Sequence, residues 1–294
     1  MLGITIGVYG SDYYLSCYNG ISMKKLVLLL LISLIPILAL AQKSEVYLNT
    51  GNSKLKKGDY KGAMQDLNKA IELNPKEFFA YSCRGFAKSQ LGDYKGAIQD
   101  FNKAIQLNPN DADAYRKSGL AKANLHDNRG AIQDYNKAIK INPKDAEAYA
   151  RRGFNKGALG DNMGAIQDYD KAIGLKPNDA DAYSGRGLAK TGHADYRGAM
   201  QDFNRALNLN PNDASAYSGR GYAKLALSDS RGALQDFNKA IQLNPNDWNA
   251  YQGRGSAKGG LGDSRVRYRT LIRRYSIFQM MLMHILVEVW LRVV

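Results

Sequence analysis

Apolar positions recur along most of the chain at the spacing of amphipathic helices. In the stretch "GAIQDFNKAIQLN", Ala97, Phe101 and Ala104 fall on one helical face, and polar residues separate them. The preceding stretch "AYSCRGFAKSQLGDY" carries a second apolar face that includes Tyr81 and Gly85. A Leu-Gly-Asp step divides the two stretches, where Gly can take a left-handed conformation and Asp can cap the next helix. The pattern therefore predicts two short helices joined by a tight turn.

The same helix pair is repeated at a constant interval. Six prolines stand 34 residues apart, at Pro75, Pro109, Pro143, Pro177, Pro211 and Pro245. Each ends a second helix, because the residue before proline is disfavoured in the helical region. The array spans 44–265 and comprises the units 44–77, 78–111, 112–145, 146–179, 180–213 and 214–247 and a partial seventh from 248. One pair cannot bury its own apolar face, so we expect the pairs to stack into an all-α solenoid.

This unit resembles the tetratricopeptide repeat, a family with the same 34-residue period. The resemblance rests on residues that recur from unit to unit, represented in the second unit by Tyr81, Gly85, Ala97, Phe101, Ala104 and Pro109. It implies a right-handed superhelix of stacked antiparallel helix pairs, in which small residues let the two backbones approach and aromatic residues fill the space around them. The chain departs from the family by Tyr where Trp is frequent, by Arg at position seven and by Lys at position eleven of the units.

A different pattern precedes the array. From Met23 the sequence reads "MKKLVLLLLISLIPILALAQ", with two lysines, an apolar run and a small-residue Ala-Leu-Ala step. We therefore expect residues 23–41 to be a cleaved signal peptide, which leaves an exported protein, periplasmic or secreted, without a membrane span. An uncleaved anchor is the alternative, although the apolar run is shorter than the roughly 20 residues that a span needs. Residues 1–22 are then interpreted as a non-native upstream extension, with translation starting at Met23.

The repeat pattern stops after Arg265. Residues 266–294 are rich in Arg, Met, Ile and Leu and match no unit. Back-translated and read one base earlier, this tail can encode "GAIQDFNKAIQ" and then "PNDAYAYSGRGLAK", which places a proline 34 residues after Pro245. We therefore interpret residues 266–294 as a frame-shifted continuation of the array, caused by a mutation or a sequence error, rather than as a membrane helix.

Charge and composition add limits to the function. A net charge of +14 with a hydrophobic fraction of 45% fits a moderately basic folded protein. Cations recur at positions seven and eleven, yet an Asp recurs with them, so we expect ion pairs such as Arg152 with Asp168. The alternative is that these ladders of cations bind an anionic polymer, which could be a polysaccharide or a nucleic acid. Nucleic acid is the less favoured of these two partners. The sequence holds no catalytic constellation, metal-ligand spacing or cofactor motif, so we predict no enzyme, no metal and no cofactor.

The function predicted from the resemblance is a scaffold that binds a protein or peptide partner without catalysis. In the family the first helices line the concave surface, and position nine faces it. Here that position forms an apolar row, which predicts a groove for a peptide. The row and an adjacent basic patch comprise Phe86, Leu120, Phe154, Leu188, Tyr222, Arg116, Lys117 and Arg151. Alternatively, the residues at position nine pack inside the stack of helices and form no groove. The array as a whole could instead act as a structural spacer in an envelope complex. Partner identity and oligomeric state stay open.

Overall fold

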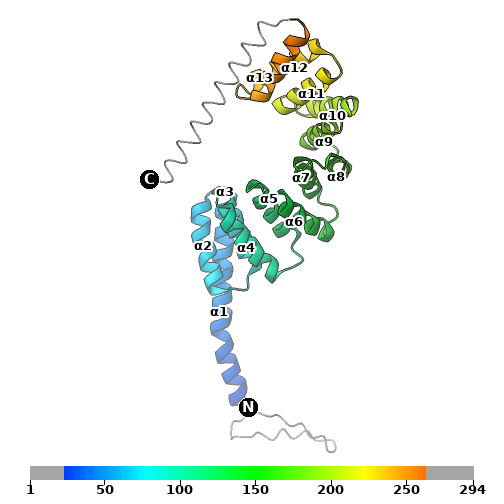
Figure 1. Cartoon of the computed structure of the whole chain (residues 1–294). Helices are drawn as coiled ribbons and strands as arrows, with labels where there is room; N and C mark the ends of the chain where they lie inside the picture. Colours follow the sequence, from blue (N-terminus) through cyan, green and yellow to red (C-terminus); the bar gives the residue numbers. More distant parts are fainter. Residues whose placement is uncertain (1–22, 263–294) are drawn as a thin grey trace, which may run out of the picture. The chain divides into compact units, whose positions relative to one another are not determined.

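The computed structural model describes residues 23–262, and of residues 23–39 it describes the backbone alone. The predictions made for residues 1–22 and 266–294 lie outside the described residues. Between residues 23 and 262 the chain forms 13 helices and no strand, which confirms the all-α prediction (Figure 1).

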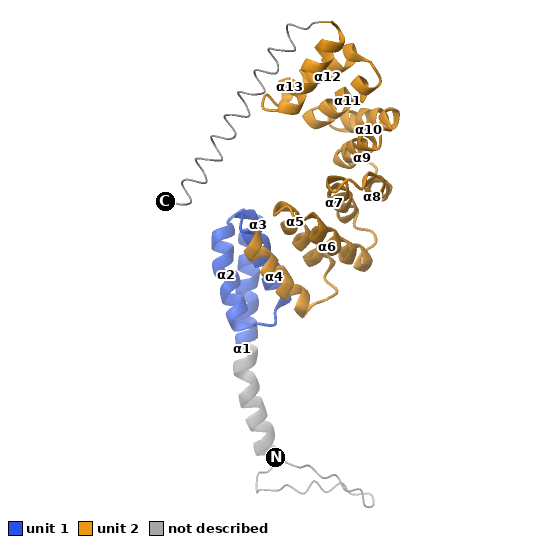
Figure 2. Cartoon of the chain, viewed as in Figure 1, with its two compact units in different colours: residues 1–93 blue, residues 94–294 orange. Residues whose placement is uncertain are grey.

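The chain divides into two compact units, residues 1–93 and 94–294 (Figure 2). The helices of the first unit are α1 (Met23–Lys56), α2 (Tyr60–Leu73) and α3 (Phe78–Gln90). The helices of the second unit are α4 (Tyr94–Leu107), α5 (Ala112–Asn124), α6 (Asn128–Ile141), α7 (Ala146–Ala158), α8 (Asn162–Leu175), α9 (Ala180–Gly192), α10 (Tyr196–Leu209), α11 (Ala214–Ala226), α12 (Ser230–Leu243) and α13 (Trp248–Gly260). The α1 helix continues through the predicted cleavage site into the first repeat.

Within the second unit, helices that follow each other along the chain pack together, as the repeat pattern predicts. The first helices of successive repeats, α5, α7, α9, α11 and α13, also contact one another in order. They therefore form a continuous row, which lies on the inner side of the arc that this unit follows in Figure 2. This row is the frame on which the candidate site is built.

Tight turns connect the two helices of each repeat. In repeat four, Gly160 has a φ of +84°, and the carboxylate of Asp161 accepts a hydrogen bond from the backbone N–H of Gly164 at 2.9 Å. The glycine thus takes the left-handed conformation and the aspartate caps α8, as predicted. Three turns hold this conformation without glycine: the residues there are His126, Ala194 and Ser228, with φ of 62°, 64° and 66°.

Aromatic side chains of the second helices form the centre of the core in the second unit. Phe101, Tyr135, Phe203 and Phe237 are each at most 1% exposed. Glycines in the first helices make room for them: a Cβ added to Gly187 would lie 2.9 Å from Cε1 of Phe203. The predicted packing of small residues against aromatic rings is therefore present in this unit.

The residues of the second repeat that the sequence assigned to the scaffold lie on α3, on α4 and directly after α4. Ala97, Phe101 and Ala104 are buried on α4, and Pro109 follows the end of that helix. On α3 of the first unit, Gly85 is buried and Tyr81 is half-buried.

Candidate functional site

A groove of about 720 Å³ lies in the second unit along helices α5, α7 and α9 and reaches the start of α11. Three residues of the predicted apolar row line it, one from each of the three helices: Leu120, Phe154 and Leu188. Phe154 is 64% exposed and Leu188 is 50% exposed. Large apolar side chains with this exposure inside a concave surface are typical of binding sites.

The other two members of the row are packed within the scaffold instead. Phe86, in the first unit, packs on the cluster around Leu55 and meets the Tyr60 ring edge-on at 6.3 Å. Tyr222 meets the Phe237 ring edge-on at 5.1 Å and donates its hydroxyl hydrogen to the backbone oxygen of Asn249 at 2.8 Å. Position nine therefore serves the core in these two repeats, which is the alternative that the sequence left open.

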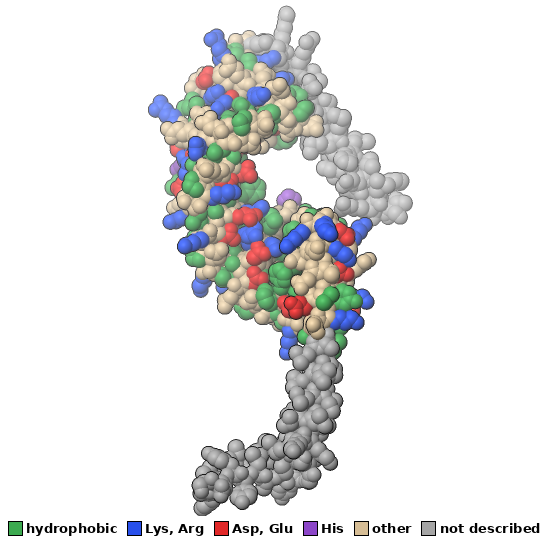
Figure 3. Space-filling view, turned by 180° about the vertical axis from the view of Figure 1, so that it is seen from behind, with side chains coloured by type: hydrophobic (Ala, Val, Ile, Leu, Met, Phe, Trp, Pro, Cys, Tyr) green, Lys and Arg blue, Asp and Glu red, His purple; other side chains and the backbone are tan. Residues whose placement is uncertain are grey.

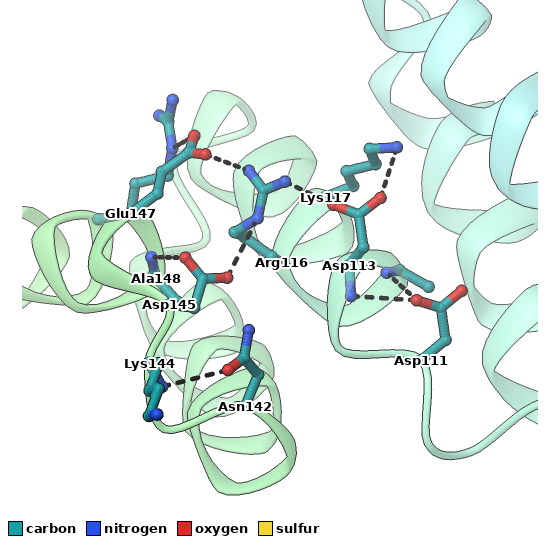
Figure 4. A network of polar contacts seen from close by, with 11 residues as sticks. Asp111, Asp113, Arg116, Lys117, Asn142, Lys144, Asp145, Glu147 and Ala148 are labelled. Atoms are coloured by element: carbon teal, nitrogen blue, oxygen red, sulfur yellow. Dashed lines mark hydrogen bonds and ion pairs between the residues drawn. The ribbon is translucent and has the colours of Figure 1, made fainter. Parts of the chain in front are cut away.

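The predicted basic patch in repeats three and four is matched by carboxylates (Figure 4). Arg116 on α5 lies between Glu147 of α7 and Asp113 of its own helix, with nitrogen–oxygen distances of 2.6 and 2.5 Å. Lys117 pairs with Asp113 at 2.7 Å, and Arg151 pairs with Glu147 at 2.7 Å.

A further carboxylate completes this network. Arg116 also reaches Asp145, the residue that caps α7, at 3.4 Å. Three cations thus meet three carboxylates, and the network joins α5 to α7 without adding net charge. Burial alone would raise the pKa of Asp113, but the hydrogen bonds and charges of Lys117 and Arg116 outweigh it and lower that pKa. The pKa of Glu147 is likewise lowered, because Arg151 and Arg116 outweigh the effect of burial.

The ladders of Arg and Lys are paired with the Asp that accompanies them. Arg152 of α7 donates two hydrogen bonds to the carboxylate of Asp168 of α8, at 2.8 and 2.5 Å. Lys156 lies 2.9 Å from the same carboxylate, which is almost fully buried. A third donor of Arg152 reaches Asn136 in the preceding repeat at 2.7 Å, and its guanidinium stacks over the Tyr149 ring. Arg152 therefore joins two repeats.

The same arrangement recurs in the next two repeats. Arg186 and Lys190 share Asp202, and Arg220 and Lys224 share Asp236. The hydrogen bonds that Arg186 donates to the Asp202 carboxylate are the largest cause that raises the pKa of Arg186. The predicted pairing of Arg with Asp is therefore present in three successive repeats, and the ladders contribute to the scaffold.

The groove also contains polar residues that the sequence prediction missed. Asn155 of α7 is 1% exposed, and Tyr135 of α6 is fully buried. Tyr169 of α8 is 5% exposed, and its hydroxyl occupies the place where a side chain on Gly185 would stand. All three line the groove. The sequence did carry a signal for them, since apolar residues stand at the same positions in most of the other repeats.

Acidic residues outnumber cations along the groove. The lining includes four acidic residues, Glu147, Asp179, Asp181 and Asp213, and two cationic residues, Arg151 and Lys176. Lys176 lies 3.2 Å from Asp179, and Asp181 is exposed. The groove therefore combines an apolar strip with a net negative rim, which disfavours an anionic ligand.

Within residues 23–262, no group of three or more His, Cys, Asp and Glu side chains is arranged to hold a metal ion. None of the helices in this part of the chain is both long and apolar enough to cross a membrane.

Comparison with known proteins identifies the repeat. The tetratricopeptide repeat model named TPR repeat matches residues 51–92, 87–125, 127–156, 158–192 and 195–228, and a second model, Tetratricopeptide repeat, matches 214–247. No protein with a curated description matches the chain.

Solved structures share the fold. A tetratricopeptide repeat protein of Parabacteroides merdae has a TM-score of 0.65 at 21% identity, over 80% of this chain and 93% of that one. MamA has a TM-score of 0.53 at 28% identity, over 59% of this chain and 94% of MamA. YrrB, described as a TPR protein with an unusual peptide-binding site, has a TM-score of 0.54 at 22% identity, over 63% of this chain and 95% of YrrB. With family models covering most of the array, the chain belongs to the tetratricopeptide repeat family.

Proposed function

We propose that the chain is a non-catalytic scaffold that binds a peptide segment of a protein partner in the groove of α5, α7 and α9. The observation that carries this proposal is the exposure of Phe154 and Leu188 inside the groove. The equivalent Tyr222 packs onto the core, so the scaffold itself does not require the exposed arrangement. Tetratricopeptide repeats in general serve protein–protein interaction, and the description of YrrB as a peptide-binding protein gives a precedent within the fold.

We infer that this function lies outside the cytoplasm, because residues 23–41 have the pattern of a signal peptide. We propose that residues 23–41 direct export and that the array meets its partner in the periplasm or the medium. Cell fractionation with mass spectrometry of the mature N-terminus tests this step: a chain beginning at Gln42 in the exported fraction supports it. A cytoplasmic chain that retains residues 23–41 contradicts it and leaves the groove proposal intact.

Binding of an anionic polymer is the second candidate, and the charges weigh against it. The ladder arginines and lysines of repeats four to six already pair with buried aspartates, so they are not free to bind a polymer. Figure 3 shows positive and negative side chains interspersed over the visible face rather than one continuous basic surface. A structural spacer is the third candidate, and it predicts that groove substitutions leave partner capture unchanged.

A displayed library of random nine-residue peptides, selected on the full chain, tests the groove proposal. We expect enriched peptides with two or more large apolar residues, whose capture is lost on Phe154→Ala and Leu188→Ala. The matched control is Leu159→Ala, because Leu159 is 48% exposed but lies at the end of α7, outside the groove lining. Enriched peptides that bind all three variants equally would reject the groove as the binding site.

A further inference from the structure

The floor of the groove carries polar atoms at positions where most other repeats place apolar side chains. Position ten of the unit is Asn155 in repeat four and alanine in repeats two, three, five, six and seven. Position twenty-four is Tyr135 in repeat three and Tyr169 in repeat four, whereas repeats two, five and six have phenylalanine. The three polar departures all line the one groove. Their clustering there is a property of the groove and not of the scaffold.

Two of these polar groups are buried without a hydrogen bond. Among residues 23–262, no partner reaches the hydroxyl of Tyr135 or the Oδ1 of Asn155. The amide nitrogen of Asn155 donates to the backbone oxygen of Arg151 at 2.7 Å, which leaves the side-chain oxygen as the free acceptor. Burial raises the pKa of Tyr135, so its hydroxyl keeps its proton and remains a donor.

A buried polar group without a partner destabilises a fold, and native proteins hold few of them. The scaffold does not need these groups, because alanine stands at position ten in five other repeats and phenylalanine stands at position twenty-four in three. Such a group is expected where a ligand supplies the missing partner. Since the groove is the proposed peptide site, the ligand is the natural source of that partner.

We propose that the groove selects peptides that insert a carboxamide, the side chain of Asn or Gln, between the apolar residues that rest on Phe154 and Leu188. A carboxamide has both an N–H donor for the Oδ1 of Asn155 and a carbonyl acceptor for the hydroxyl of Tyr135. A carboxylate lacks the donor and also meets the negative rim of the groove, and an aliphatic side chain satisfies neither group. This inference rests on the proposed function and specifies its ligand.

Access to the floor requires side-chain movement, because both oxygen atoms are covered in the free chain. Rotamer changes at binding surfaces are common even where the backbone is rigid. Binding of the carboxamide therefore requires a rotamer change of Asn155 that exposes its side-chain oxygen to the groove. Tyr169, whose hydroxyl lies beside Gly185, supplies a third polar group at the same floor.

The repeat itself supplies variants that remove the polar atoms without disturbing the packing. Asn155→Ala and Tyr135→Phe introduce the residues that other repeats carry at these positions. We expect Tyr135→Phe to fold with an unchanged or higher melting temperature, since it deletes a hydroxyl that lacks a partner. Asn155→Ala deletes an unpartnered oxygen together with the hydrogen bond that the amide nitrogen donates to the backbone oxygen of Arg151, so its melting temperature should change little. A melting temperature lowered by several degrees contradicts the inference, because it shows that the polar atoms already stabilise the free chain.

The test is the same nine-residue library selected in parallel on the full wild-type chain and on the Asn155→Ala and Tyr135→Phe chains. Wild type should enrich Asn or Gln beside apolar residues, and both variants should lose that preference while still enriching apolar peptides. For one selected peptide, replacing its Gln by Leu or Glu should weaken binding to wild type about five- to tenfold. The Gln-to-Leu replacement should change binding to Asn155→Ala much less.

Two outcomes separate this inference from the proposed function. If peptides depend on Phe154 but show no carboxamide preference, the inference is overturned and the groove proposal stands. If no selected peptide depends on Phe154 or Leu188, both are rejected.

Discussion

Repeats three and four (112–179) and repeats five and six (180–247) share one scaffold but differ on the side that faces the groove. In repeats five and six, position six is Gly185 or Gly219, and the aromatic ring of the preceding repeat fills the space above it. In repeats three and four the same position holds Lys117 or Arg151, which belong to the charged network that joins α5 to α7. The arginine–aspartate pairing continues from repeat four to repeat six. The residues that hold the scaffold together are therefore the same in these repeats, whereas the residues that face the groove differ. We propose that the function lies on the side that differs.

The buried carboxylates of the ladder should show the largest effect on stability. Asp168→Ala leaves Arg152 and Lys156 without their shared partner, which should lower the free energy of unfolding by roughly 3 kcal/mol. Asp202→Ala in repeat five should lower the free energy of unfolding by about the same amount, because Arg186 pairs with Asp202 as Arg152 pairs with Asp168. Urea denaturation measures both losses.

An exposed carboxylate provides the control for this prediction. Asp170 pairs with Arg186 at the surface, with 53% of its side chain exposed. Asp170→Ala should therefore change the free energy of unfolding by about 0.5 kcal/mol or less. Equal losses for Asp168→Ala and Asp170→Ala would contradict the structural role of the ladder.

The position-six glycines should show the next largest effect. A methyl group at Gly185 would overlap the phenol ring of Tyr169, so Gly185→Ala should destabilise the chain by roughly 1–3 kcal/mol. Gly174→Ala is the control, since nothing lies within 4 Å of its Cβ and alanine favours a helix by up to about 1 kcal/mol. The melting temperature should fall for Gly185→Ala and rise for Gly174→Ala. A shift of both melting temperatures in the same direction would show that the Tyr169 ring does not fill the space beside Gly185.

The turns without glycine offer a smaller, stabilising change. Ala194 holds a left-handed φ of 64°, which costs a residue with a Cβ about 1 kcal/mol. Ala194→Gly should recover most of that cost, and Gly160→Ala should lose a similar amount in repeat four. The two melting temperatures should shift by comparable amounts in opposite directions. A destabilised Ala194→Gly chain would show that this turn is not strained.

The charged network of repeats three and four should give the smallest effect, visible as a dependence on pH. The pKa values of Asp113 and Glu147 are lowered in the folded chain, so their pairs stabilise it above the pKa values of the unfolded chain. That contribution is lost as the pH falls from the unfolded values through the lower folded values. Arg116→Gln should flatten this part of the melting-temperature profile, and an unchanged profile would mean that the network does not act on stability.

The repeat period made the scaffold predictable from the sequence, because one set of residues recurs in unit after unit. The pairing of Arg152 with Asp168 could be predicted for the same reason. The role of position nine could not be predicted from the sequence. Phe154 and Tyr222 occupy equivalent positions, and only the neighbouring side chains decide which of the two is exposed. The charge balance around Arg116 also depends on contacts between repeats, which the spacing of residues within one unit does not reveal.

The central claim, that the groove binds a peptide, is tested most directly by the affinity of one library-selected peptide for three full-length chains. Fluorescence polarisation with wild type, Phe154→Ala and Leu159→Ala gives the comparison. We predict that Phe154→Ala weakens binding about tenfold or more, as expected for a central apolar contact. Leu159→Ala should bind within about twofold of wild type, a difference too small to mark an energetic contact. Equal affinity of wild type and Phe154→Ala would contradict the claim.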